Sequence, residues 1–213
     1  MNAIDLYCMA NQDRSDRVRW LLEEMQVPYK DHYLKKKNGD MNSLEYRALN
    51  PMGRTPTIND NGTIIFESGA ICLYLADRFP EAKLAPGIND PERAEYLQWM
   101  VWSVASLECV IARMFTHRRN EEEKAVTEAF VKEQCEILKL ALIPVLSRQE
   151  YILKSGFSAA DIMLAAVLPG AWADIVEPNP SIKAYMQRLM ARPAAVKTEV
   201  FAWNSMQNPS WIF

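Results

Sequence analysis

Residues 50–56, Asn-Pro-Met-Gly-Arg-Thr-Pro, place a proline directly before a short apolar segment. Proline has no N–H to donate, so we expect Pro56 at the start of a strand or at a bulge. If the Thr55–Pro56 bond is cis, the backbone N–H and C=O of Thr55 turn outward. These two groups can then pair with an extended peptide as an added strand would. The segment is therefore a candidate peptide-binding site.

Glu67 and Ser68 form a second candidate site further along the chain. They lie between a predicted strand and a predicted helix, and the amides at a helix N-terminus favour a bound carboxylate. The Glu67 side chain is a partner for an ammonium group. A carboxylate beside an ammonium, about one residue away from a peptide backbone, describes a γ-glutamyl peptide.

The elements that must position these groups alternate between strand and helix in the first eighty residues. The apolar periodicity predicts strands over residues 4–8, 29–34, 57–59 and 63–66, and helices over 15–26, 43–48 and 67–78. Asp60-Asn61-Gly62 is a strong signal for a tight turn between the last two strands. The order predicts a small α/β sandwich.

The second part of the chain changes character. Pro86, Gly87 and Pro91 mark residues 81–91 as a linker, and residues 92–213 show helical spacing with no convincing strand. Ser158 and Asp161 have the spacing of a capping box at the start of a helix expected over residues 158–175. We therefore expect an α/β domain at residues 1–80 and an all-helical domain at 92–213.

Composition excludes several other classes of protein. The chain has 213 residues, 49% of them hydrophobic, and a net charge of −3, which suits a globular protein and disfavours a nucleic-acid binder. No targeting segment is visible, and no run approaches about 18 uninterrupted apolar residues, so we expect no membrane-spanning segment. Cys8, Cys72, Cys109 and Cys135 stand far apart and only two histidines occur, so we expect buried, reduced thiols and no metal site. These features predict a cytoplasmic protein.

The two motifs in this order, with the strand–helix start and the helical second half, resemble the cytosolic glutathione transferase family, in its bacterial and fungal Ser/Cys type rather than its Tyr type. The resemblance covers essentially the whole chain. It implies a thioredoxin-like domain that binds glutathione as a co-substrate, a helical domain that shapes the site for a hydrophobic electrophile, and a homodimer.

The resemblance also implies roles for five glutathione-binding residues. Thr55 would pair with the cysteinyl backbone beside a cis Pro56, and Glu67 and Ser68 would hold the γ-glutamyl end. Arg54 falls near the glycyl end, where the family often has Gln or Lys. One lysine of the run 35–37 could also meet the glycyl carboxylate, and the sequence does not choose among the three.

The position of the thiol-activating group departs from the pattern of the family. Members of the family use a Ser, Tyr or Cys after the first strand, but here Asp13 occupies the usual serine position, and a nearby carboxylate would raise the pKa of the thiol. The catalytic candidates are Ser15 and Asn11 as neutral donors, and Arg14 with the helix-start amides as a source of positive potential. Ser15 has the alternative role of capping its helix.

Three functions remain in competition on these residues. The first is a transferase that joins the glutathione thiolate to a hydrophobic electrophile. The second is a glutathione-dependent disulfide oxidoreductase, if Asn11 lies over the sulfur, and the third is a non-catalytic glutathione-binding protein, to which Asp13 points. In the helical half Glu108 is a candidate to face the thiol. Trp99, Met100, Trp102, Met114 and Phe115 are either a wall of the electrophile site or plain core.

Overall fold

The structure, a computed structural model, describes residues 2–10, 13–117 and 124–202. Four strands, β1 (Ile4–Cys8), β2 (Tyr29–Tyr33), β3 (Thr57–Asp60) and β4 (Thr63–Phe66), form one sheet in the order β2-β1-β3-β4. Strand β1 runs parallel to β2 and antiparallel to β3, and β3 runs antiparallel to β4. The strand positions agree with the sequence prediction.

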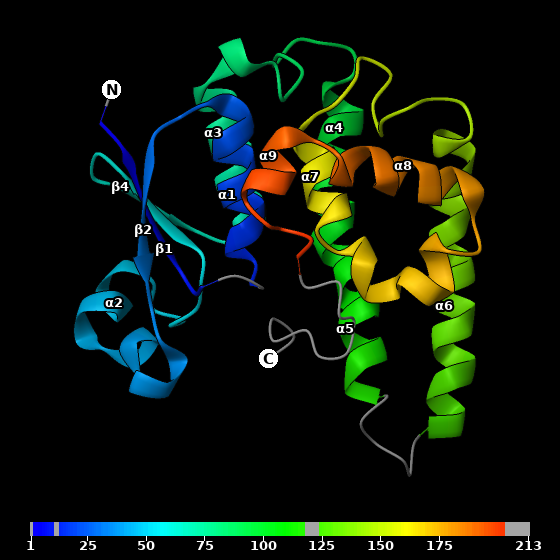
Figure 1. Ribbon diagram of the computed structural model, residues 1–213, viewed down its shortest axis with the longest axis horizontal. Helices are drawn as coiled ribbons and strands as arrows, with labels where there is room; N and C mark the ends of the chain where they lie inside the picture. Colours follow the sequence, from blue (N-terminus) through cyan, green and yellow to red (C-terminus); the bar gives the residue numbers. More distant parts are fainter. Residues whose placement is uncertain (1, 11–12, 118–123, 203–213) are drawn as a thin grey trace.

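Helices α1 (Ser15–Met25) and α3 (Ser68–Arg78) lie between the sheet and the helices of the second half (Figure 1). The short α2 (Leu44–Leu49) lies apart from α1 and α3, near the end of the sheet where β1 ends. Val18, Leu21 and Leu22 on the predicted apolar face of α1 are fully buried. Burial of each such side chain contributes about 1.5–3 kcal/mol, so this face anchors α1 to the core.

The hairpin between β3 and β4 has the predicted tight turn. Asn61 and Gly62 both adopt positive φ, 51° and 95°, as a two-residue hairpin turn requires. The turn sets a register in which Thr57 pairs with Phe66. That register brings the residues just before β3 and just after β4 to the same end of the sheet.

The second half is helical, as predicted. Its helices are α4 (Arg93–Trp102), α5 (Glu108–His117), α6 (Lys124–Leu146), α7 (Ala159–Ala165), α8 (Pro180–Met190) and α9 (Pro193–Lys197). A π-helical turn, Ser103–Leu107, joins α4 to α5. The sheet therefore belongs to an N-terminal thioredoxin-like domain that a helical domain follows, while the exact linker bounds of 81–91 stay a prediction.

The prediction of one helix over residues 158–175 is wrong. Helix α7 ends at Ala165 and is followed by a 3₁₀ turn, Leu168–Ala171, and a π-helical turn, Trp172–Val176. Pro169 has no N–H for an α-helical hydrogen bond, and its ring disfavours a continuous helix. Residues 159–176 are long and apolar enough to cross a membrane by composition, but 78% of this segment is buried inside the protein, which identifies it as core.

The predicted capping box is confirmed at the start of α7. The Ser158 hydroxyl accepts from the Ala160 amide, and the Asp161 carboxylate accepts from the Ser158 amide at 2.8 Å. Asp161 also accepts from the Ile152 amide and the Tyr185 hydroxyl. The box therefore joins α7 to α8 and to the loop before α7.

We expect Ser158→Ala to lower the free energy of unfolding by about 1 kcal/mol because the cap is lost. For a chain of this length the melting temperature should fall by about 2–4 °C. Thermal unfolding followed by circular dichroism measures the change. The control is Ser155→Ala, since Ser155 is exposed nearby and we expect almost no effect. Equal melting temperatures for the two variants would contradict the structural role of the cap.

Candidate functional site

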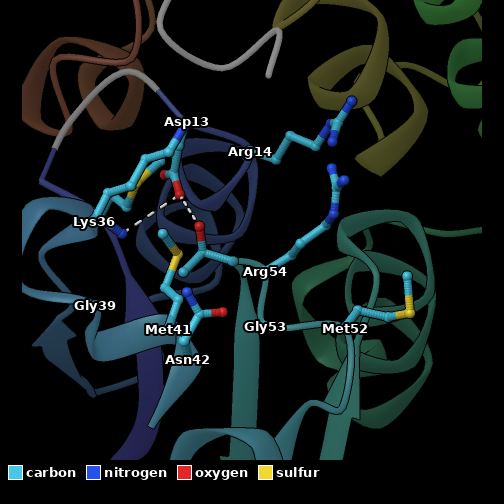
Figure 2. Close-up of a pocket in the computed structure, with 11 residues that line it drawn as sticks. Asp13, Arg14, Lys36, Gly39, Met41, Asn42, Met52, Gly53 and Arg54 are labelled. Carbon is cyan, nitrogen blue, oxygen red and sulfur yellow. Dashed lines mark hydrogen bonds between the residues drawn. The ribbon is translucent and has the colours of Figure 1, made fainter.

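Three segments distant in sequence meet at one end of the sheet. Strand β1 ends there, β3 begins there, and α3 begins there directly after β4, because Tyr7 and Phe66 both pair with Thr57. A pocket of about 300 Å³ opens at this end (Figure 2). The register thus brings both sequence motifs to one end of the sheet, and the first of them, through residues 52–55, lines the pocket.

The charged side chains that line the pocket are one carboxylate and three cations: Asp13, Arg14, Lys36 and Arg54. Figure 2 shows Lys36 on one side of Asp13 and Arg14 on the other. Of the lysine run 35–37, Lys36 is the member that lines this pocket. The excess of positive charge favours a ligand that carries carboxylates or a thiolate.

Asp13 joins the start of α1 to the loop before β3. Its Oδ2 accepts from the Ser15 hydroxyl at 2.8 Å, from the Thr55 hydroxyl at 2.5 Å and from the Met9 amide at 3.4 Å. Its Oδ1 accepts from the Ser15 amide at 3.0 Å. Hydroxyl and amide donors therefore surround this buried carboxylate, which explains why a charge is tolerated there.

The alternative role of Ser15 as a helix cap is not what the structure shows. Arg14 occupies the N-cap position of α1 without a side-chain capping bond, and the Asp13 carboxylate binds the Ser15 amide instead. The Ser15 side chain is fully buried and its hydroxyl donates to Asp13. Arg14 lines the pocket with a side chain that is 36% exposed, and Asn11 lies outside the described residues.

Two polar side chains fix the loop before β3 through hydrogen bonds to its backbone. The Thr55–Pro56 bond is cis, as expected. Asn50 Nδ2 and the Tyr46 hydroxyl both donate to the Arg54 carbonyl, at 2.8 and 2.5 Å. The sequence analysis quoted Asn50 within the motif but missed Tyr46, for which the sequence carries no signal.

Glycine is required at position 53 of this loop. Gly53 has φ 59°, and an added Cβ would lie 2.7 Å from the Met41 carbonyl oxygen. A side chain at this position would therefore force the loop away from residue 41. The close approach of the two backbones shapes one wall of the pocket.

Glu67 connects β4 to α3, and Ser68 is the first residue of α3. Glu67 is exposed and has φ 72°, a conformation that costs a non-glycine residue energy and occurs often at ligand-binding sites. No side chain caps α3, so its first amides can bind an anion. Ser68 is buried, and its hydroxyl accepts from Arg17 Nη1 at 3.2 Å.

A buried ion-pair network reaches this site from the helical domain. Glu108, the first residue of α5, contacts Arg14 Nε at 2.6 Å through Oε1 and Arg17 Nη2 at 2.8 Å through Oε2. Burial opposes ionisation of Glu108, but the two arginines outweigh it and hold its pKa below the ordinary value. The sequence analysis named Glu108 and missed Arg17, because helical spacing does not reveal ion pairs between domains.

None of the protein's four cysteines lines this pocket. Burial is the main reason that the pKa of Cys8, next to the pocket, rises to about 12, and the buried Cys72 behaves in the same way. Cys135 is buried as well, but Cys109 is exposed, which corrects the expectation of four buried thiols. Within the described residues no group of three or more His, Cys, Asp or Glu side chains could hold a metal ion.

The aromatic and methionine side chains of the helical half belong mainly to the core. Trp99, Met100 and Met114 are buried, and the Trp99 ring packs edge-on against Trp102 at 5.3 Å. The Phe115 side chain lies outside the described residues. The interpretation of Trp99, Met100 and Met114 as a wall of the electrophile site is therefore replaced by the core interpretation.

Comparison with known proteins gives the same family for both halves of the chain. The model for "Glutathione S-transferase, N-terminal domain" matches residues 14–78, and the model for "Glutathione S-transferase, C-terminal domain" matches residues 104–193. The chain is 31% identical over 161 residues to glutathione S-transferase GstA of Escherichia coli O157:H7, an alignment that covers 73% of this chain and 75% of the relative.

Solved structures agree with this assignment. A glutathione transferase homologue from Sulfitobacter, with bound glutathione, is 25% identical, and the match covers 95% of this chain and 99% of the other with a TM-score of 0.77. The glutathione transferase URE2P8 from Phanerochaete chrysosporium, solved with oxidized glutathione, shares the fold at 22% identity and a TM-score of 0.83 over 98% of both chains. With its four-stranded mixed sheet, its helical second domain and a pocket beside the cis proline, the chain belongs to the glutathione S-transferase family.

Proposed function

We propose that the protein performs its family's reaction by attack of the glutathione thiolate on a hydrophobic electrophile. The observation that carries this proposal is the meeting of Thr55 and Ser68 at one end of the sheet, beside a pocket lined by three cations. Glutathione on the first domain and the electrophile against residues 92–213 would react mainly through proximity. Reduced glutathione is a cytoplasmic compound, so the proposal places the enzyme in the cytoplasm.

The binding geometry follows the chemistry of the tripeptide. The Glu67 carboxylate binds the ammonium group of the γ-glutamyl end, and the first amides of α3 with Ser68 bind its α-carboxylate. The backbone of Thr55, which Asp13 fixes through the side chain, pairs with the cysteinyl residue beside Pro56. Lys36 and Arg54 line the pocket and belong to the segments that the family resemblance assigns to the glycyl end, so we assign the glycyl carboxylate to them.

Arg14 is the catalytic candidate that the geometry favours. It lines the pocket at the N-terminus of α1, where its charge and the helix-start amides both favour a thiolate. The Ser15 hydroxyl is engaged by Asp13, so we assign it first to positioning. Asn11 is the third candidate, and its dominance would favour the disulfide oxidoreductase interpretation.

The proposal includes the Ser/Cys type within the family and a homodimer. Tyr7, the residue that a Tyr-type enzyme would use, stacks on His32 with ring centroids 4.7 Å apart and does not line the pocket. Ile64 and Phe66 are exposed on β4, an edge strand, and Val101 is exposed on α4. Apolar side chains in an edge strand favour burial against a second chain.

We expect Glu67→Gln to lower the affinity for glutathione about ten- to hundredfold, because a charge-assisted hydrogen bond to the ammonium is worth about 1.5–3 kcal/mol. Isothermal titration calorimetry measures the affinity. The matched control is Glu150→Gln, an exposed glutamate after α6, for which we expect wild-type affinity. Wild-type affinity in a folded Glu67→Gln protein would refute the clamp.

Thiol activation is tested by the ultraviolet absorbance of the bound thiolate against pH. We expect Arg14→Ala to raise the pKa of bound glutathione by about one to two units, since a charged donor is worth about 1–3 kcal/mol. Arg14→Lys, which keeps the charge, should retain part of the effect, and Ser15→Ala should change the pKa little. If Asn11→Ala gives the largest shift, the oxidoreductase interpretation gains. If none of the variants shifts the titration, the non-catalytic interpretation becomes the better one.

Asp13→Ser restores the residue that the family usually has and separates two interpretations of Asp13. If the carboxylate positions Ser15 and Thr55, the variant should lose about 1–3 kcal/mol of the free energy of unfolding and should not gain turnover. Urea denaturation and steady-state turnover with a generic aryl halide measure the two effects. A stable variant with faster turnover would instead identify Asp13 as a suppressor of the standard mechanism.

A further inference from the structure

Glu108 occupies a special place in the helical domain. The π-helical turn Ser103–Leu107 ends directly before it, and such turns, which shift the face that later residues present, are frequent at functional sites. Glu108 is 4% exposed and contacts α1 of the first domain through Arg14 and Arg17. A buried acid at a domain boundary needs such partners.

The two arginines lead to two different parts of the proposed glutathione site. Arg14, held at its Nε by Glu108, lines the pocket proposed for the thiol. Arg17, held at Nη2, donates through Nη1 to the Ser68 hydroxyl at the proposed γ-glutamyl end. One carboxylate of the second domain thus fixes a side chain at the proposed thiol position and another next to the proposed γ-glutamyl position.

We propose that Glu108 is a positioning residue through which the helical domain orders the glutathione site. It holds Arg14 at the thiol and, through Arg17, Ser68 at the γ-glutamyl group. The inference rests on the proposed role of Ser68 in binding glutathione.

The physical reason is the burial of Arg17. Its side chain is 3% exposed, so without Glu108 the guanidinium keeps its charge in a site that water does not reach. The side chain must then move toward other acceptors, and Ser68 loses the donor that fixes its hydroxyl. A glutamate that only joined the domains would affect stability and leave glutathione binding unchanged.

The chain offers a matched control for this distinction. Glu24, near the other end of α1, makes a two-point ion pair with Arg192 of the helical domain at 2.7 and 2.8 Å. Its side chain is 10% exposed and it does not line the pocket at the end of the sheet. Glu24→Gln therefore removes a buried carboxylate between the domains without touching the glutathione site.

The experiment compares Glu108→Gln with Glu24→Gln in the full-length protein. We expect both variants to have lower melting temperatures. Only Glu108→Gln should bind S-methylglutathione about tenfold more weakly by calorimetry and raise the KM for glutathione to match. The KM for the electrophile should stay unchanged. S-methylglutathione has no ionisable thiol, so the comparison isolates binding from activation. Equal glutathione affinities in the two variants would overturn the proposal.

A double-mutant cycle distinguishes failure of this inference from failure of the proposed binding site. If Ser68→Ala leaves the affinity unchanged, Ser68 does not bind glutathione and the proposed site is wrong. If Ser68→Ala weakens binding and Glu108→Gln does not, the inference alone is wrong. We expect both to weaken binding and the double variant to lose less than the product of the two effects, because Arg17 transmits one to the other. If the loss of affinity in the double variant equals the product of the two single losses, the effects are independent, and transmission through Arg17 is contradicted.

A second variant covers the case in which Glu108→Gln does not fold. Glu108→Asp keeps the charge and shortens the side chain by one methylene, so it can no longer reach both arginines at hydrogen-bond distance. We expect a folded protein with an intermediate loss of affinity for S-methylglutathione. Wild-type affinity in Glu108→Asp would count against the need for both contacts and would overturn the proposal.

Discussion

Helix α1 is buried on nearly every side along its first two turns, and its charged side chains therefore need partners inside the protein. Asp13, just before the helix, is met by hydroxyls and amides, and Arg17 is met by Glu108 and Ser68. Each pairing draws a different segment to the N-terminal end of α1. The proposed glutathione site is the place where these segments meet.

Backbone groups and side chains share the work of recognition in this glutathione transferase. The sheet register decides that Thr55 lies beside the start of α3, and Asn50 and Tyr46 fix the loop that carries Thr55. In the proposed site, charged side chains then supply selectivity for a ligand with an ammonium group and two carboxylates. Because the backbone sets the spacing, this part of the site tolerates an unusual residue such as Asp13.

The helical domain is attached to both ends of α1 by ion pairs. Glu108 holds the N-terminal end, and Arg192 and Lys197 hold Glu24 and Glu23 near the C-terminal end. The Glu108–Arg17 pair is buried, and a buried pair contributes little net stability, but a misplaced partner is costly, so it favours one orientation of the domains. In the proposed reaction, that orientation decides how the electrophile approaches the thiol.

The sequence by itself predicted the sheet, the helical second domain, the hairpin turn, the capping box and the two motifs that lie at one end of the sheet. These depend on local patterns: apolar periodicity, Asn61-Gly62, Ser158 with Asp161, and a proline before a strand. The end of helix α7 at Ala165 also depends on local sequence, because Pro169 disfavours a continuous helix. The prediction missed this end because the apolar pattern continues past Pro169.

Only the tertiary structure decided the polar contacts. Asp13 looked like a misplaced charge, but it accepts from Thr55, which lies 42 positions away in the chain. Glu108 reaches Arg14 across 94 positions, and Lys36 rather than its neighbours lines the pocket. Such pairs depend on how folded elements face one another, and a carboxylate finds its donors by proximity in space. Sequence spacing carries no record of that proximity.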